Sequence, residues 1–420
     1  MSRQPDSLPD PSKPAGTVND AMPFDHVVVV MMENHSFDNL LGELPRVGQP
    51  AADGLTFDSA GAATNANPGT AATPPEVRAF PFPSTAQGPH VAQTWNATHE
   101  QINSGKMDGF VRSVNSTQPM GYYPARVLPF AYSLASTFTL ANRWFCSAPC
   151  QTFPNRRFLM AGTAYGGITT DVESLTDGPP PNGTIFDRLQ AHGISWRDYF
   201  TDLPYTAIIP SILEKHPLHI APIARFYEDC DAGTLPAVSF VDPEVGAVSL
   251  VGKLLSSLPV VGELASGLAT VGGDEEEPQD LSYGEAWAYR IVEAVLRSPA
   301  WPRTLLIYTY DEHGGYYDHV PPPPAIPPDS IPPKLTSTDV PGGYDIYGPR
   351  LPAVVASPYS RPHGVTDVVH DHTSVLATIE AKWNLPALTH RDANAATVMD
   401  FLDPGHAAYM SPPTVQGPQQ

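Results

Sequence analysis

The sequence predicts an α/β protein, a three-layer α/β/α sandwich around a mostly parallel central sheet. Short apolar runs that suit strands buried on both faces alternate along the chain with segments of amphipathic helical character. The alternation extends over most of the chain, and no internal repeat is visible. We therefore expect a single domain at residues 24–405, after a disordered leader at 1–23 and before a tail at 406–420.

The first part of this domain begins with a strand. FDHVVVVMM (24–32) is a short continuous apolar run, as in a strand covered on both faces. SFDNLLG (36–42) then begins a helix, for which Asn34 or Ser36 would be the N-cap. Residues 45–93 are rich in Pro, Gly, Ala and Thr and predict a loop. The next expected elements are a helix at 127–140, a strand at 141–148 and a helix at 154–163, with Pro154 in its first turn.

The second part continues the alternation. The pattern predicts a helix that ends at its glycine in TIFDRLQAHG. It predicts a clearly amphipathic helix, directly before a strand, in SYGEAWAYRIVEAVLRSP. The expected strands are at 194–200, 235–243, 304–310 and 351–358. The expected helices are at 184–193, 282–299 and 371–383. The regular order of strands and helices favours a sheet with helices on both faces.

Composition excludes some classes of function. A formal net charge of −21 repels nucleic acid and anionic membranes, so a nucleic-acid-binding protein is disfavoured. Three cysteines do not make a disulfide framework, although a Cys146–Cys150 bridge is allowed. The first 25 residues lack the apolar core of a signal peptide, so the sequence alone suggests a cytoplasmic protein.

The sequence contains no convincing transmembrane segment. The most apolar stretch, 245–273, is interrupted by Lys253, Pro259 and Glu263. We expect it to be an insertion that packs on the domain or associates with a second copy of the chain. A surface that contacts lipid is the alternative.

Two polar clusters follow two of the predicted strands. Glu33 and Asn34 come directly after the first strand, and Asp311, Glu312 and His313 follow TLLIYTY. Ligand sites in parallel sheets lie at the carboxyl ends of the strands, so these side chains are expected to converge. Oxygen ligands with a histidine nearby suit a hard or borderline divalent metal ion. The alternatives are a helix cap for the first cluster and an ordinary polar turn for the second.

A third feature lies just before the helix at 154–163. The hydroxyl of Thr152 could contact both a metal ion and a bound phosphoryl group, with the helix N–H groups facing the anion. Thr152 could instead be only an N-cap. Cys150 is the rival nucleophile, although free cysteines are more often inert.

These residues stand in recognisable motifs. The chain resembles the bacterial phosphoesterase family of phospholipases C and acid phosphatases, within the alkaline-phosphatase-like superfamily. The resemblance covers MMENHSFDNLLG, THEQINSGKMDGF, FCSAPCQTFPNRRFLMAGT, LPAVSFVDP, SPAWPRTLLIYTYDEHGGYYDHVPPP, YGPRLPAVVASPYS and HDHTSVLATIEAKW. These segments run in the order of the family from Val27 to about Asp403.

The resemblance implies one metal ion, divalent or ferric, of unknown identity. Its ligands would be Glu33, Asn34, Asp311, Glu312 and Thr152, and Thr152 would also be the nucleophile. Asn34 would contact the phosphoryl oxygens as well. His99 matches an active-site histidine near the phosphate, where it would bind substrate and take part in catalysis. His372 matches a motif position that is catalytic or that caps its own helix.

The chain departs from the family at one position. Many members carry a His-Pro before the long helix, and the matching stretch here is GGDEEEPQDLSYGEAW. Glu276 falls where the histidine would be, and it could act as a general acid only with a raised pKa. Another histidine could substitute, with His216, His219 and His313 as candidates.

The predicted function is a metal-dependent phosphoester hydrolase, phospholipase C-like, that cleaves diesters or monoesters through a phospho-enzyme intermediate on Thr152. The substrate would be a phosphoester, with phospholipid among the candidates. One alternative is a broad-specificity acid phosphatase. The alternative from another class is a catalytically weakened metal-binding or interaction protein, which the missing histidine favours.

Overall fold

The central sheet has eight strands in the order β13–β6–β12–β11–β1–β10–β8–β9. The computed structural model describes residues 2–246, 252–254 and 272–418. Five neighbouring strands run parallel. They are β9 (Ile220–Pro222), β8 (Trp196–Phe200), β10 (Val238–Asp242), β1 (His26–Met32) and β11 (Thr304–Tyr310). The sheet is completed by β12 (Ala353–Ala356), β6 (Thr139–Ala141) and β13 (Val365–Thr366).

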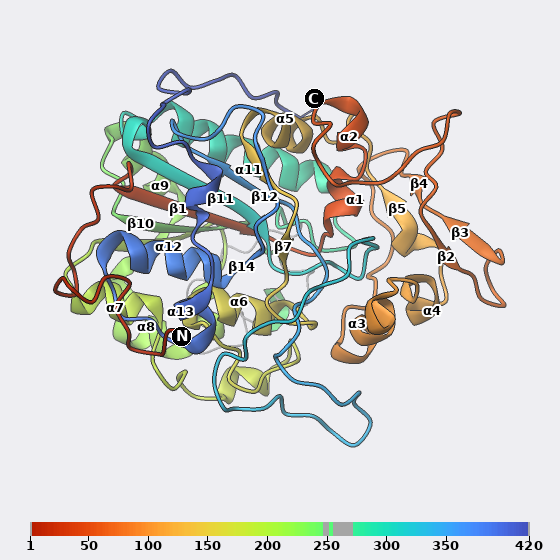
Figure 1. The fold of residues 1–420 in the computed structure, drawn as a ribbon, viewed down its shortest axis with the longest axis horizontal. Helices are drawn as coiled ribbons and strands as arrows, with labels where there is room; N and C mark the ends of the chain where they lie inside the picture. Colours follow the sequence, from red (N-terminus) through yellow and green to blue (C-terminus); the bar gives the residue numbers. More distant parts are fainter. Residues whose placement is uncertain (1, 247–251, 255–271, 419–420) are drawn as a thin grey trace.

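Helices cover both faces of this sheet, as Figure 1 shows. One face carries α5 (Pro129–Thr137), α9 (Ile223–Ala232) and α11 (Leu281–Arg297). The other carries α6 (Thr152–Ala161), α7 (Ile185–Ala191), α8 (Pro210–Lys215), α12 (Thr373–Trp383) and α13 (His390–Asn394). The predicted three-layer α/β/α class with a mostly parallel sheet is therefore confirmed.

The two central strands explain where the polar clusters lie. Residues 27–32 of β1 are all buried, because helices pack on both sides of this apolar strand. β1 and β11 pair in register from His26 opposite Thr304 to Met32 opposite Tyr310. The residues that follow the two strands consequently emerge side by side at the carboxyl edge of the sheet.

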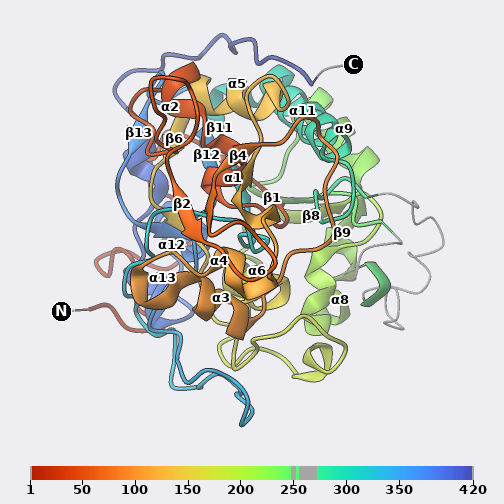
Figure 2. The ribbon, with the colours of Figure 1, turned by 90° about the vertical axis from the view of Figure 1, so that its right-hand side faces the viewer.

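A smaller lobe lies beside this edge (Figure 2). It contains α3 (Trp95–Ile102), α4 (Phe110–Val114), β2 (Ala66–Pro68), β3 (Glu76–Arg78), β4 (Phe80–Pro81) and β5 (Gly121–Tyr122). A small apolar core that includes Met107, Phe110 and Tyr122 holds it together. Residues 45–93, predicted as loop, thus contain three short strands. The remaining elements are α1 (Phe37–Leu41), α2 (Leu44–Val47) and the pair β7 (Trp144–Phe145) and β14 (His370–Asp371).

Two regions differ from the prediction. β12 runs antiparallel to β11, because an apolar pattern fixes burial but not strand direction. Residues 2–23 are an ordered segment rather than a disordered leader. The side-chain amide of Asn384 donates to the carbonyls of Asp10, Lys13 and Pro14 at 3.0–3.1 Å, and Met22 is buried in the core. These contacts with the end of α12 are not visible in the composition of the segment.

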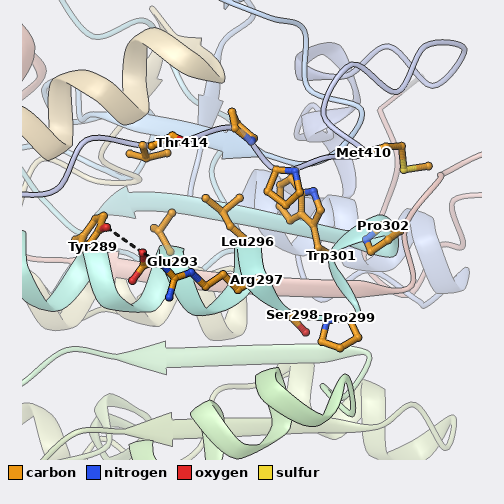
Figure 3. A pocket seen from close by; sticks show the side chains of 14 residues that line it. Tyr289, Glu293, Leu296, Arg297, Ser298, Pro299, Trp301, Pro302, Met410 and Thr414 are labelled. Carbon is orange, nitrogen blue, oxygen red and sulfur yellow. Dashed lines mark hydrogen bonds and ion pairs between the residues drawn. The ribbon is translucent and has the colours of Figure 1, made fainter.

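The C-terminal segment lies across α11. The indole of Trp301 donates to the carbonyl of Tyr409 (2.8 Å), and the backbone N–H of Gln416 donates to Ser133 Oγ (2.8 Å). Between this segment and α11 is a cavity of about 590 Å³ (Figure 3). Its walls are mainly apolar and include Leu296 and Met410. The cavity lies where β11 begins, at the opposite edge of the sheet from the polar clusters.

The described helices include none with the length and apolar character that crossing a bilayer requires. Of the apolar stretch 245–273, only residues 245–246, 252–254 and 272–273 are described. The predicted packing, self-association or lipid contact of this insertion therefore lies outside the described residues.

Candidate active site

The ends of β1 and β11 are joined by backbone-to-carboxylate hydrogen bonds. The N–H of Asn34 (3.2 Å) and the N–H of Glu312 (2.7 Å) both donate to Asp311 Oδ1. Asn34 has a left-handed backbone with φ of 69°. Gly314 packs against it, and a Cβ at Gly314 would lie 1.8 Å from the Asn34 carbonyl oxygen. A glycine is required there because the two turns touch.

The structure does not use Asn34 as a helix cap. Ser36 occupies the N-cap position of α1, and its Oγ accepts from the N–H of Asn39 (3.2 Å). The side chain of Asn34 is instead held between two partners. Its Oδ1 accepts from Gln93 Nε2 (2.9 Å), and its Nδ2 donates to Glu277 Oε2 (3.3 Å). The amide is thus fixed in one orientation at the site.

Thr152 points at Glu33 rather than capping its own helix. It is the first residue of α6, and its Oγ donates to Glu33 Oε1 (3.1 Å). Arg156 follows four residues later on the same face of α6. Its Nε donates to Asp311 Oδ2 (3.0 Å), and its Nη2 lies 3.8 Å from Glu33 Oε2. Arg156 therefore links Asp311 to Glu33. Thr152 contacts Glu33, and the N–H groups of Asn34 and Glu312 contact Asp311, so the five predicted residues form one connected group.

Arg156 and two further residues were missed from the sequence. The hydroxyl of Tyr205 donates to Glu33 Oε2 and to Asp274 Oδ2 (3.1 Å for the latter). The guanidinium of Arg156 lies 3.4 Å from the ring centroid of Tyr205. The four-residue spacing from Thr152 could have indicated Arg156. Tyr205 and Asp274 come from distant loops, and no sequence pattern points to them.

Buried carboxyl groups are more numerous here than the positive side chains that contact them, so the residues fit a cation. Burial raises the pKa of Asp311 to about 7, although Arg156 opposes the rise. Burial and the neighbouring Asp311 raise the pKa of Glu312 well above its usual range. Glu312 Oε1 is buried and has no hydrogen-bond partner among the described residues. Carboxylate, amide and hydroxyl oxygens around such an orphan suit a hard metal ion.

The two family-matched histidines occupy different surroundings. His372 is buried, with Nδ1 3.0 Å from Ser147 Oγ and Nε2 3.0 Å from the carbonyl of Tyr310. Burial lowers its pKa to about 4, so it is a neutral imidazole beneath the end of β11. It stands at the N-cap position of α12 without a capping side-chain bond. Its catalytic role stays a prediction.

His99 lies on α3, beside the cluster rather than within it. Its Nδ1 is 2.7 Å from the carbonyl of Trp95, and its ring packs on the Trp95 indole. Its hydrogen bonds, within the described part of the chain, do not reach the carboxylates. Burial lowers its pKa. Its predicted contact with substrate stays a prediction.

Glu277, not Glu276, faces Asn34. Glu277 is buried, directly precedes Pro278, and accepts from the Asn34 amide. The backbone N–H of Glu276 donates to Asp274 Oδ1 (3.1 Å). Glu277 is therefore an acidic residue of this segment that contacts Asn34, and the catalytic role assigned to Glu276 stays a prediction.

The substitute histidines are not equivalent. His216 and His219 pack on Trp196 at the amino end of β8, at the opposite edge of the sheet. His313 is close, with Nδ1 3.6 Å from Glu312 Oε2, but it is fully buried and bonded to Gln101. Burial lowers the pKa of His313 to about 3.

The rival nucleophile is a protonated thiol. Cys150 is free and buried, and burial raises its pKa far above neutral pH. Cys146 is also free, so the bridge that the sequence allowed is not formed. A buried thiol without an activating base is a poor nucleophile.

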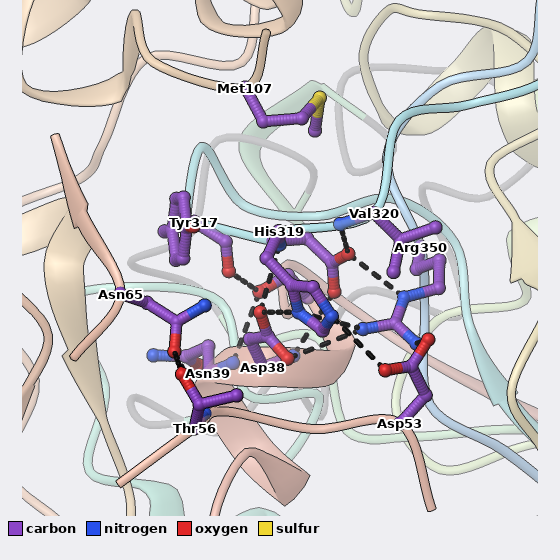
Figure 4. Close-up of polar contacts among 12 residues, drawn as sticks. Asp38, Asn39, Asp53, Thr56, Asn65, Met107, Tyr317, His319, Val320 and Arg350 are labelled. Atoms are coloured by element: carbon purple, nitrogen blue, oxygen red, sulfur yellow. Dashed lines mark hydrogen bonds and ion pairs between the residues drawn. The ribbon is translucent and has the colours of Figure 1, made fainter. Parts of the chain in front are cut away.

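A second acidic cluster lies near the same carboxyl edge of the sheet. Asp38, Asp318 and His319 offer ligand atoms that all lie within 4.8 Å of one another, a spacing that a metal ion could use. Arg350 already contacts this group, with Nε 2.8 Å from Asp318 Oδ1 and Nη2 3.3 Å from Asp38 Oδ1 (Figure 4). The sequence analysis did not identify this cluster.

The structure is an α/β protein whose candidate active-site groups lie at the carboxyl edge of a mostly parallel sheet. The chain belongs to the Phosphoesterase family, whose model matches residues 24–386. It is accordingly a hydrolase acting on phosphoric ester bonds.

Similar proteins include named phospholipases. Non-specific phospholipase C6 of Arabidopsis thaliana is 31% identical over 409 residues, which cover 90% of this chain and 72% of that protein. Phospholipase C A of Mycobacterium tuberculosis is 29% identical, with coverage of 86% and 73%. Non-hemolytic phospholipase C of Pseudomonas aeruginosa is 28% identical, with coverage of 86% and 54%.

Solved structures are more distant. The lipoteichoic acid synthase LtaP from Listeria monocytogenes has a TM-score of 0.40 and 10% identity, covering 90% of this chain and 78% of that one. A protein in the alkaline phosphatase superfamily from Vibrio parahaemolyticus has a TM-score of 0.36 and 12% identity, covering 78% and 72%. These scores are low, and the fold class rests on the sheet order and the two helical layers.

Proposed function

We propose that the protein is a metal-dependent, phospholipase C-like phosphoester hydrolase with a phospho-enzyme intermediate on Thr152. The observation that most supports this proposal is the hydrogen bond from Thr152 Oγ to Glu33 Oε1 at the start of α6. A hydroxyl at a helix start, aimed at a buried carboxylate cluster, combines a nucleophile with N–H groups that face an anion.

One metal ion, divalent or ferric, would be held by Glu33, Asn34, Asp311, Glu312 and Thr152. When bound, it would neutralise phosphate charge and lower the pKa of the Thr152 hydroxyl. The donor set supports this assignment, because Glu312 Oε1 is otherwise an orphaned buried oxygen. Carboxylate and amide ligands do not select among calcium, magnesium, manganese, zinc and iron.

The residues of the chain have separate tasks in this proposal. Thr152 Oγ attacks phosphorus, and its proton passes to Glu33 Oε1, the acceptor that it already contacts. Asn34, held by Gln93 and Glu277, presents its amide to the phosphoryl oxygens. Arg156 keeps Asp311 in place. Water then hydrolyses the phosphothreonine and restores the free hydroxyl.

The preference for a phospholipase C-like substrate rests on the names of the similar proteins. The experiment compares hydrolysis of p-nitrophenyl phosphate and p-nitrophenyl phosphorylcholine, each before and after chelation and after addition of single metals. Turnover of the choline diester that chelation abolishes would support the proposal. Turnover of the monoester alone would indicate a phosphatase. If both activities remain after chelation, metal dependence is refuted.

The covalent intermediate has its own test. Enzyme quenched in acid during turnover should carry an added mass on the peptide that contains Thr152, a phosphoryl group from the monoester or a phosphorylcholine group from the choline diester. Thr152→Ala should carry neither. Thr152→Ser keeps a hydroxyl at the same place and should retain the adduct. Wild-type turnover by Thr152→Ala would overturn the assignment.

A further inference from the structure

We propose that His90, paired with Glu277, is the general acid that protonates the leaving alcohol, an inference that rests on the proposed function. His90 lies in the loop before α3, and its Nδ1 is 3.6 Å from Glu277 Oε2. The same carboxylate oxygen accepts from the Asn34 amide at 3.3 Å. One buried carboxylate therefore connects an imidazole to the residue that would contact the phosphoryl group.

Exposure separates His90 from the other nearby histidines. Its side chain is 42% exposed, whereas that of Glu277 is completely buried. His313 and His372 are fully buried and neutral. His35 is buried as well, and both of its ring nitrogens are engaged, by Asn39 Oδ1 and the carbonyl of Glu275. His90 is therefore accessible to a substrate that binds from solvent, while its Nδ1 faces the buried Glu277 carboxylate.

Charge favours the protonated imidazole at this position. Burial of the ring lowers the pKa of His90, but the hydrogen bond and charge of Glu277, with the charge of Glu33, outweigh it and raise the pKa. By contrast, burial lowers the pKa of His99. A general acid must carry its proton near the working pH, so His90 suits the task better than His99.

Cleavage of the ester bond and transfer of the His90 proton occur in the same step of this proposal. As the bond from Thr152 Oγ to phosphorus forms, the bond from phosphorus to the leaving oxygen breaks, and that oxygen keeps the electron pair. The imidazolium of His90 gives its proton to this oxygen, which departs as the alcohol. In the second half-reaction the neutral imidazole takes a proton from the attacking water as the new bond to phosphorus forms. The bond from phosphorus to Thr152 Oγ breaks, and Thr152 Oγ takes back the proton that Glu33 held. Glu277 takes no part in the proton transfer and acts as a positioning residue.

Leaving-group dependence tests this role. A general acid matters most for an alcohol that leaves poorly as an anion and least for p-nitrophenol. For His90→Asn we expect kcat/KM to fall about 10²–10⁴-fold on an alkyl phosphoester and less than about tenfold on its p-nitrophenyl counterpart. The esters are monoesters or choline diesters, according to which the wild type hydrolyses. His406→Asn, an exposed histidine of the C-terminal segment, is the matched control.

The activity of the wild type separates a failure of the His90 role from a failure of the proposed function. Equal losses on both esters, or no loss on the alkyl ester, would overturn the role of His90 while the wild type remains active. A wild type that hydrolyses neither ester would overturn both. Glu277→Gln should keep His90 but move the basic limb of the pH profile to lower pH, and the His90 ring signals in NMR should titrate correspondingly lower. An unmoved titration would reject the pairing.

Discussion

Two acidic clusters lie near the carboxyl edge of the sheet, and each contains a buried arginine. In the first, Arg156 contacts Asp311 and reaches Glu33 only at 3.8 Å, while Glu312 Oε1 has no partner among the described residues. In the second, Arg350 contacts both Asp38 and Asp318. His319 adds a second cation, 2.7 Å from Asp38 Oδ2.

The difference lies in how the negative charge is balanced. The second cluster is balanced by its own side chains, as expected for a structural ion-pair network. The first lacks sufficient positive charge, which is costly in a folded protein unless a ligand supplies it. Proximity of acidic groups alone would favour the second cluster as a metal site, because its ligand atoms are grouped more tightly, whereas the balance of charge favours the first.

The largest expected effect is on catalysis in the first cluster. Thr152→Ala should reduce kcat by about 10⁴-fold or more, since removal of a nucleophile abolishes the covalent route. Thermal stability should change little by comparison. Steady-state kinetics and a melting curve on the same preparation measure both, and Thr152→Ser is the control that keeps a hydroxyl. A modest decrease in kcat would place the nucleophile elsewhere.

The next effect is on stability in the second cluster. Arg350→Met should lower the free energy of unfolding by about 3–5 kcal/mol, because Asp38 and Asp318 lose their buried partner. Activity per folded molecule and its response to chelators should be retained. Denaturant unfolding with a parallel assay checks this. Unchanged stability, or lost metal response, would mean that the second cluster has been misjudged.

Much of the first cluster could be predicted from the sequence. A strand covered on both faces leaves a continuous apolar run, as in β1 and β11, and the residues that follow such runs must emerge at one edge. Glu33 and Asp311 follow from that rule. Thr152 follows from its place at a helix start.

The remaining features depend on contacts between distant segments. The direction of β12, the docking of residues 2–23 on Asn384 and the approach of Tyr205 to Glu33 leave no periodic trace in the chain. The contact of Glu277 with Asn34 likewise has no signal in the sequence. The cluster of Asp38, Asp318 and His319 assembles only when α1 meets the turn after β11.

A smaller effect is the pH dependence of stability that His319 confers in the second cluster. Burial opposes protonation of His319, but the charge and hydrogen bond of Asp38 outweigh it and raise the pKa to about 9. A raised pKa means stability that is complete below about pH 6.5 and is lost as pH rises to about 9. We expect a loss of about 2 kcal/mol over that range, and His319→Gln should flatten it. Urea unfolding at several pH values measures the slope. An unchanged slope in the variant would assign it to another group.

The smallest expected effect is a change in the free energy of unfolding, and it should have opposite signs in the two clusters. Glu312→Gln neutralises a buried carboxyl group whose Oε1 has no hydrogen-bond partner among the described residues, so the metal-free protein should gain about 1 kcal/mol of stability. Asp318→Asn makes the same chemical change where Arg350 Nε and the N–H of Val320 both donate to the carboxylate, so it should destabilise. Added metal should stabilise the wild type and Asp318→Asn, but Glu312→Gln much less. Unfolding curves of the wild type and of both variants, each with chelator and with metal, measure these differences. If both substitutions destabilise the chelated protein equally, the first cluster is balanced without a cation, and its assignment as the metal site fails.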